Sequence, residues 1–411
     1  MRKRLRPDYL IMLGVFVLNL LFIWRFFAVP FPTAFSAPVV PTLARGLEIF
    51  GADSAWAVRW VLLVFYSFGP LSLFFLVREV AGRRMAAVLA AIVYSLPILR
   101  SRFEALVSLG DGAHIAALTL IPLAAFSLLR FLKSGSFGSA VLASLAILLV
   151  ALTSPFGLFA LFSVMLVTTF SEMLLGYGRL KLFRFVLVVV FAFGLSGFWY
   201  NPEFIRLSLF SPSGRAVVLA LKNLIPLSFF LVPVLGTFGF LLFDKRPNLQ
   251  PLFVALGLTI VFGLISFAGG LSPMAISAQS RYLPELAMSI AFLWGVVGSA
   301  VYGLLPVLPQ GKWFPVPMGK RKLVRKGLVA AFVVFCLVAV FLSPFQEMPS
   351  SRRSGRLVVG ITKPVVSGLG EVQEQTGPTD RLVGYGISFI TVVVIGILGI
   401  WLKREGHQVK S

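Results

Sequence analysis

The sequence is poor in cysteine, histidine and acidic residues. Its 411 residues include two histidines and a single cysteine, Cys336. One cysteine excludes an intrachain disulfide and any metal site built from several cysteines. No P-loop, no G-x-S-x-G nucleophile motif and no H-E-x-x-H zinc motif is present. The sequence therefore carries no signature of a P-loop nucleotidase, a serine hydrolase of that type or a zinc protease.

Charge is scarce, whereas long apolar runs recur from end to end. Hydrophobic residues make up 58% of the chain and charged residues 13%, and the mean hydropathy is +0.95. A membrane-spanning helix needs about 20 apolar residues. The pattern predicts an all-α, polytopic transmembrane bundle of about 12 spans. The predicted spans cover residues 9–29, 57–77, 84–99, 112–132, 137–153, 155–176, 182–199, 224–243, 250–268, 283–305, 327–343 and 385–402.

One pair of these spans leaves two readings open. The spans at 137–153 and 155–176 are separated only by Thr153-Ser154-Pro155. They form either a tight helical hairpin or one broken helix. Prolines also fall inside predicted spans, at Pro70, Pro97, Pro122 and Pro233. Membrane helices tolerate proline where neighbours satisfy the freed carbonyl, so we expect a kinked bundle.

The distribution of basic residues predicts the topology. The chain has 37 Lys and Arg against 15 Asp and Glu, a formal net charge of +22. The basic residues gather in alternate connections, which by the positive-inside rule face the cytoplasm. Both termini are then cytoplasmic. Anionic lipid headgroups and this topology account for the charge, and no nucleic-acid-binding motif is present. We expect a multi-pass protein of the cell membrane whose first partner is membrane lipid.

This topology divides the chain into three parts. Residues 1–343 form the membrane bundle, with outer loops at 30–56, 100–111, 200–223 and 269–282. Residues 344–384 form a small extracytoplasmic loop segment, and residues 385–411 form the last span and a basic cytoplasmic tail. Within the first outer loop, Leu43, Leu47 and Phe50 have a helical spacing, so Pro41 to Phe50 is predicted to be a short interfacial helix.

The polar residues that could carry chemistry lie in these outer loops. Charge beside bilayer-length segments is costly and is usually tied to function or to a water-filled face. The stretch from Leu99 to Leu123 contains Arg100, Arg102, Glu104, Asp111 and His114. A short solvated loop with incidental charges is the alternative. Asp111 and His114 are three apart at a predicted helix start. Asp111 either caps that helix or holds a divalent cation together with His114 and another loop.

Further polar residues are predicted to face the same side. They are Arg45, Glu48, Asp53, Asn201, Glu203, Arg206, Gln279, Arg281, Tyr282 and Glu285. Acids can act as a base or a metal ligand, and arginines can bind a phosphate through two hydrogen bonds. Arg281 and Glu285 are four apart on one predicted helix, so they could instead pair with each other.

Several segments resemble the GT-C glycosyltransferases, polytopic enzymes that use polyprenyl-phosphate sugars outside the cytoplasm. PILRSRFEALVSLGDGAHIAA is similar to the stretch of the oligosaccharyltransferase catalytic subunit in which a proline and a Ser-Arg pair precede an A-G-x-x-D-N-E-x-I-A signature. The matching positions are Pro97, Ser101, Arg102, Gly110, Asp111, Ile115 and Ala116. VREVAGRRMAAVLAAIVYSLPIL, LSGFWYNPEF and QSRYLPELAMSIAFLWG also look like segments of this clan. The resemblance covers roughly residues 5–305.

The resemblance implies roles for particular residues. Asp111 would be the metal ligand or base, with His114 as a second ligand, and Asp53 or Glu48 would replace the acid that the family carries after its first span. Arg102 and Arg281 would hold the lipid phosphate, and Tyr282, Glu203 and Arg206 would contact substrate. The implied cofactor is a divalent cation, Mg²⁺ or Mn²⁺. The implied partners are a polyprenyl-phosphate sugar and other envelope-glycan enzymes.

Two departures from the family keep other functions open. No acid lies between Phe27 and Ala44, and Ala113 stands where the signature has an acid. The chain is therefore either a glycosyltransferase or a non-catalytic GT-C-like subunit that binds lipid-linked glycan. A transporter or flippase for lipid or polysaccharide is a third hypothesis. Against it, the sequence has no internal repeat and no acid or lysine near the centre of a span.

Overall fold

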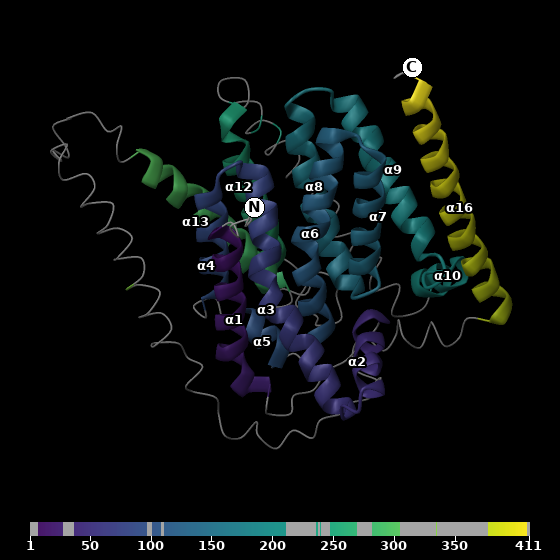
Figure 1. Cartoon of the computed structure of the whole chain (residues 1–411), viewed down its shortest axis with the longest axis horizontal. Helices are drawn as coiled ribbons and strands as arrows, with labels where there is room; N and C mark the ends of the chain where they lie inside the picture. The colour runs from purple at the N-terminus through teal and green to yellow at the C-terminus, as the bar shows by residue number, and fades with distance from the viewer. Residues whose placement is uncertain are drawn as a thin grey trace, which may run out of the picture.

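The computed structural model describes residues 7–27, 37–96, 101–107, 111–210, 236, 239, 247–268, 282–304, 334 and 377–408. Every regular element within these residues is a helix, as the sequence predicted. The longer helices stand roughly side by side in Figure 1. The elements are α1 (Pro7–Phe27), α2 (Val39–Ile49), α3 (Ser54–Ala81), α4 (Arg84–Ser95), α5 (Ser101–Val107), α6 (Gly112–Ser134), α7 (Phe137–Ala151), α8 (Pro155–Leu174), α9 (Gly178–Ser196), α10 (Pro202–Phe210), the 3₁₀ helix η1 (Pro247–Leu249), α12 (Gln250–Ala268), α13 (Leu283–Leu304) and α16 (Pro378–Gln408).

Several of these helices are long and apolar enough to cross a membrane. Within the described residues five qualify: α3, α6, α8, most of α13 and the first 24 residues of α16. Shorter apolar helical stretches occur at Tyr9–Leu21, Arg84–Ser95, Phe137–Ala151 and Gln250–Ser266. The chain is thus a helical, membrane-type protein. The number of spans and their sidedness stay predictions, and the predicted spans at 224–243 and 327–343 lie almost wholly outside the described residues.

The ambiguous pair of spans is resolved as two helices. Helix α7 ends at Ala151 and α8 begins at Pro155. Ser154 caps α8 by accepting a hydrogen bond from the Gly157 amide at 3.4 Å. Proline suits the first helical position, because its missing N–H has no intrahelical partner there. This local sequence therefore ends one helix and starts the next within a tight turn.

The connections differ in detail from the predicted loops. Helix α2 occupies the stretch predicted as a short helix between Pro41 and Phe50. The loop predicted at 100–111 contains a helix, α5, whose arginine packs inward. Helix α16 begins at Pro378, within the segment predicted as the loop 344–384. The helix therefore begins earlier than hydropathy alone indicated, and its first turn includes the hydrogen bond from the Arg381 amide to the Gly377 carbonyl at 3.2 Å.

Contacts near the helix ends fix the directions of the helices. A Cβ on Gly112 would meet Leu62, and a Cβ on Gly157 would meet Ala117, so α3, α6 and α8 begin at the same end. We call this the Arg102 end, because α5 and its Arg102 lie there (Figure 1). Helices α3, α6 and α8 therefore run in the same direction.

The opposite end carries basic residues that cap helices. We call it the Glu172 end, after the buried glutamate of α8. Lys133 donates to the Glu79 carbonyl of α3 at 3.0 Å, and Lys181 donates to the Glu172 carbonyl at 2.6 Å. Arg184 donates to the Leu132 carbonyl of α6 at 2.7 Å. Cations are favoured at helix C-termini, where the last carbonyls lack intrahelical partners.

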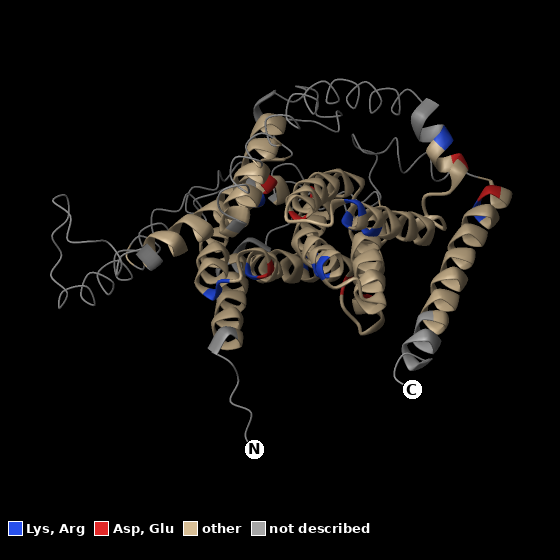
Figure 2. Ribbon diagram, turned by 90° about the horizontal axis from the view of Figure 1, so that it is seen from above, with Lys and Arg blue, Asp and Glu red and all other residues tan. Residues whose placement is uncertain are grey.

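The core lies around α6, whereas α16 lies at the edge. In the apolar part of α6, 78% of the residues are buried, but in α16 only 6% are. Figure 2 looks along the bundle and shows α16 apart from the central helices, with charged residues few throughout. Helix α16 contacts α9, α10 and α7. The Arg102 end is therefore held by the packed central helices, and α16 is an outer element.

Candidate functional site

Arg102 is a buried cation enclosed by two tyrosine rings. It is 3% exposed, and its guanidinium carbon lies 4.0 Å from the centroid of the Tyr66 ring and 4.3 Å from that of Tyr94. Its Nη2 donates a hydrogen bond to the Tyr66 carbonyl at 2.6 Å. The electron-rich ring faces attract a cation, and the attraction is stronger where water is excluded. Helices α3, α4 and α5 therefore meet around this side chain.

The sequence of α3 prepares the place for this guanidinium. Pro70 lies inside α3 and has no N–H, so it cannot donate to the carbonyl four residues earlier, that of Tyr66. Arg102 supplies a donor for that carbonyl. Gly69 provides the space, because a Cβ there would lie 2.5 Å from Arg102 Nη2. On α3, Gly69 thus provides the space and Pro70 leaves a free hydrogen-bond acceptor for an arginine on another helix.

His114 and Glu285 form a second buried polar pair close by. His114 Nε2 lies 2.8 Å from Glu285 Oε1, and both side chains are fully buried. His114 is in the first turn of α6 and Glu285 in the first turn of α13, where a carboxylate is favoured by the helix dipole. Tyr282 packs edge-on against His114, with ring centroids 5.7 Å apart. The two groups lie on neighbouring helices, since α4, which carries Tyr94, and α5, which carries Arg102, both contact α13, which carries Glu285.

Three polar atoms of this region are buried and have no hydrogen-bond partner within the described part of the chain. They are Arg102 Nε, the Tyr94 hydroxyl and Glu285 Oε2. Most buried polar groups in proteins are hydrogen-bonded, because leaving one unpaired costs free energy. We call Tyr66, Tyr94, Arg102, His114 and Glu285 the Arg102 cluster. It offers two donors and one carboxylate oxygen to a polar ligand.

Two of the three predicted acids, Asp111 and Asp53, cap helices. Asp111 caps α6: its Oδ1 accepts a hydrogen bond from the His114 amide at 3.3 Å. Asp53 caps α3 by accepting from the Ala55 amide at 3.1 Å, and it is exposed. Glu48 is half-buried in the last turn of α2. Their predicted catalytic roles are not tested by these contacts.

The predicted metal pair is divided between different partners. The Asp111 carboxylate holds the backbone of α6, whereas His114 Nε2 faces Glu285. Among the described residues, no group of three or more His, Cys, Asp and Glu side chains could hold a metal ion. A metal ion held by Asp111 and His114 stays a prediction, and we derive no step through one.

The predicted substrate-binding residues fall into separate places. Arg102 and Tyr282 belong to the buried region around α6, whereas Glu203 and Arg206 lie on α10. Arg206 donates to Glu203 through Nε at 2.7 Å and through Nη2 at 2.6 Å. These hydrogen bonds lower the pKa of the Glu203 carboxyl. Arg281 lies outside the described residues, so its predicted role stays a prediction.

Sequence reasoning missed two members of the cluster. Tyr66 and Tyr94 lie within apolar runs and carry no charge that would draw attention. Glu285 was among the polar residues predicted to face the outer side and was also considered as a partner of Arg281, but it pairs with His114 of another helix. Pro70 was the available signal for Tyr66, because a proline inside a span requires a donor for the freed carbonyl.

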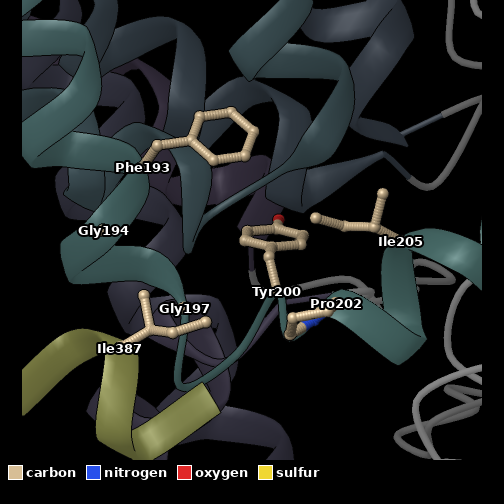
Figure 3. A pocket seen from close by; sticks show the side chains of 7 residues that line it. All are labelled: Phe193, Gly194, Gly197, Tyr200, Pro202, Ile205 and Ile387. Carbon is tan, nitrogen blue, oxygen red and sulfur yellow. The ribbon is translucent and has the colours of Figure 1, made fainter. Parts of the chain in front are cut away.

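A separate pocket lies at the same end of the bundle, beside α16. Its volume is about 310 Å³, and it is lined by Phe193, Gly194, Gly197, Tyr200, Pro202, Ile205 and Ile387 (Figure 3). The Tyr200 hydroxyl donates to the Ala151 carbonyl at 2.7 Å, and burial raises the Tyr200 pKa. The other lining side chains are apolar. This pocket is distinct from the Arg102 cluster in its residues and in its chemistry.

Among known proteins, matches come from solved structures. No protein family matches the sequence, and no curated protein matches it. The chain is similar to the crystal structure of ArnT from Cupriavidus metallidurans bound to undecaprenyl phosphate. The TM-score is 0.38 and the identity is 16%, over 94% of this chain and 76% of that chain. At this TM-score and identity the match carries no argument about family or function.

Proposed function

We propose that this membrane protein binds a polyprenyl-phosphate-linked sugar at the Arg102 cluster and acts as a GT-C-like glycosyltransferase. One observation carries the proposal: Arg102 Nε and the Tyr94 hydroxyl are buried donors with no acceptor in the described part of the chain. A phosphate oxygen accepts from both, and arginine is well suited to phosphate. An apolar bundle with a buried cation at one end suits an amphiphile with an anionic head.

The position of the cluster supports an extracytoplasmic site. Lys133, Lys181 and Arg184 lie at the Glu172 end, opposite the cluster. Basic residues mark the cytoplasmic side of membrane proteins. The Arg102 end then faces outward, which is the side on which the family that the sequence resembles uses its lipid-linked sugars.

The cluster also contains a group that can accept a proton. In the proposed transfer, an acceptor hydroxyl attacks the anomeric carbon of the sugar, a C–O bond forms, and the bond from that carbon to the phosphate oxygen breaks. Polyprenyl phosphate leaves with the bonding electron pair. Glu285 Oε2 would accept the hydroxyl proton, while His114 holds the other carboxylate oxygen at 2.8 Å. Asp111, Asp53 and Glu48 stay alternative candidates for this base.

Tyr94→Phe tests the site with the smallest change. It removes the unpartnered hydroxyl and keeps the ring that packs on Arg102. We expect decaprenyl phosphate to raise the thermal unfolding temperature of the detergent-solubilised protein, and decaprenol to have no effect. Tyr94→Phe should weaken phosphate-lipid binding about three- to tenfold, the effect of one lost hydrogen bond. Tyr200→Phe is the control, because the Tyr200 hydroxyl is bonded to Ala151, away from the cluster.

The results decide the proposal. Equal stabilisation by decaprenyl phosphate and decaprenol would show that the phosphate does not contribute to binding. If both Tyr94→Phe and Gly69→Ala bind the phosphate lipid as the wild type does, the Arg102 cluster is not the binding site. Gly69→Ala forces the guanidinium to move, because the added Cβ would lie 2.5 Å from it. Gly14→Ala is its control, since a Cβ on Gly14 meets nothing within 4 Å.

A non-catalytic GT-C-like protein that binds lipid-linked glycan is the second candidate. The observation in its favour is that the acids already have intramolecular roles: Asp53 and Asp111 cap helices, and Glu285 pairs with His114. Binding of decaprenyl phosphate without release of sugar from a panel of decaprenyl-phosphate sugars, with a range of acceptor alcohols, would favour this candidate.

A further inference from the structure

We propose that the pocket beside α16 binds one hydrocarbon chain of a membrane glycerophospholipid. The inference is independent of the proposed function, because it uses no residue of the Arg102 cluster. Except for Tyr200, the side chains that line the pocket are apolar, and the Tyr200 hydroxyl is satisfied by the Ala151 carbonyl. The lining side chains therefore have no free hydrogen-bonding group for a polar ligand. A hydrocarbon chain suits such a lining, because it has no hydrogen bonds to lose and apolar surface is favoured in an apolar environment.

The surroundings of α16 indicate where the occupant comes from. The apolar part of this helix is only 6% buried, and exposed side chains such as Phe389 (70%) and Ile390 (63%) follow its length. Such a surface is not stable against water, so lipid covers it. Ile387 of the same helix lines the pocket, as Figure 3 shows. The pocket thus borders the lipid that surrounds α16.

A close helix crossing fixes the pocket in place. The Phe198 amide donates to Ser388 Oγ at 2.8 Å, and Ser388 Oγ lies 3.2 Å from the Gly194 carbonyl as a donor. A Cβ on Gly194 would meet Thr391, and a Cβ on Gly384 would meet the Gly197 carbonyl. Small residues let the two backbones approach. The crossing holds α16 against α9, and the pocket remains beside it as a constant feature.

Charged residues near the pocket mark the position of a headgroup. Arg206 follows the lining residue Ile205 by one position, and its side chain is 66% exposed. It is paired with Glu203 and also interacts electrostatically with Asp380 at the start of α16. Helices α10 and α16, which contact each other, thus carry ionic groups on the segments that also supply Ile205 and Ile387 to the pocket. A phospholipid with a chain in the pocket would set its phosphate and polar headgroup beside them.

The volume fits part of one chain. At about 310 Å³ the pocket is at the lower limit of the roughly 300–1,000 Å³ of ordinary ligand sites. That space equals about ten water molecules at ~30 Å³ each, so it takes a segment of a single chain, not a whole lipid. The site is therefore selective for a narrow, flexible, apolar occupant.

Photo-crosslinking tests the proposal directly. The full-length protein in detergent is incubated with phosphatidylglycerol that carries a diazirine in one acyl chain, then irradiated and digested. We expect labelled peptides to concentrate at residues 193–205 and 384–391. Ile205→Trp fills the pocket and should lower this labelling about tenfold, which corresponds to ~1.4 kcal/mol. Val190→Trp is the control: Val190 is on α9, 57% exposed and outside the lining, so labelling should be unchanged.

Ile387→Trp fills the same pocket from α16 and provides a second test should Ile205→Trp fail to fold. Loss of labelling in either folded pocket variant, with retention in Val190→Trp, supports the site. Labelling spread evenly over exposed positions of α9 and α16, or unchanged by the pocket variants, would overturn it. Displacement of the probe by equimolar decaprenyl phosphate, but not by unlabelled phosphatidylglycerol, would also overturn it, since the occupant would then be a polyprenyl chain.

Discussion

Arg102 donates a hydrogen bond to the Tyr66 carbonyl, the group that Pro70 leaves without a helical donor. This 2.6 Å contact joins a carbonyl of α3, which the proline leaves free, to the charged side chain of α5. It explains how α3 tolerates proline in an apolar setting and why a guanidinium is stable there. The same contact makes Pro70 and Arg102 energetically dependent on each other.

A double-mutant cycle measures this dependence. Arg102→Leu should leave the Tyr66 carbonyl buried without a donor, at a cost of about 1–3 kcal/mol. In the Pro70→Ala background the new backbone N–H can bond that carbonyl, so the same change should cost less. We expect a coupling energy within the range of about 0.5–3 kcal/mol seen for contacting residues, from unfolding in mild detergent. Additive effects would show that the two residues act separately.

The helices could be predicted, whereas the buried contacts could not. Apolar runs of bilayer length placed the helices, and helical spacing placed α2, because both signals are local in sequence. The prediction for Arg102 gave a phosphate contact in an outer loop. The structure encloses it between Tyr66 and Tyr94, which come from two other helices. Side-chain neighbours across helices depend on tertiary packing, which hydropathy does not record.

The acids show the same limit, because a partner on another helix cannot be predicted from spacing in the sequence. The i,i+3 spacing of Asp111 and His114 predicted either a cap or a ligand pair, and the cap geometry is present. The partner of His114, Glu285, is on α13 and could not be read from spacing. The sequence placed Glu285 among the outer polar residues, at the start of an apolar run, but did not indicate its partner. An acid in such a position is a reason to look for a buried partner.

Glu172→Gln should destabilise the opposite end of the bundle. Glu172 is 2% exposed; its Oε2 lies 3.1 Å from Lys181 Nζ, and its Oε1 accepts from Gln250 Nε2 at 2.8 Å. Removing one charge of a fully buried pair costs about 3–5 kcal/mol, and because Lys181 is 12% exposed we expect a loss below that range. Glu203→Gln is the matched control, since the Glu203–Arg206 pair is on the surface and solvent screens it. Thermal unfolding of both variants checks this, and equal losses would contradict it.

The predicted topology can be tested outside the described residues. In a Cys336→Ala background, a cysteine introduced at Lys363 should react with a membrane-impermeant thiol reagent in intact cells. A cysteine at Lys322 should react only after the membrane is opened, because this basic connection is predicted to be cytoplasmic. The reverse pattern would show that the Arg102 end faces the cytoplasm. It would contradict the proposal that the protein uses a lipid-linked sugar on the outer side.

Asp111→Asn separates a structural role of Asp111 from a chemical one. The side chain caps α6 through the His114 amide at 3.3 Å, and asparagine caps about as well as aspartate. Expression and thermal unfolding should therefore change little. A base or metal ligand needs the negative charge, which asparagine lacks. We predict that the variant loses sugar transfer, or divalent-metal binding where transfer has no assay. A variant with full transfer and binding would reduce Asp111 to a cap and leave Glu285 as the acid of the site.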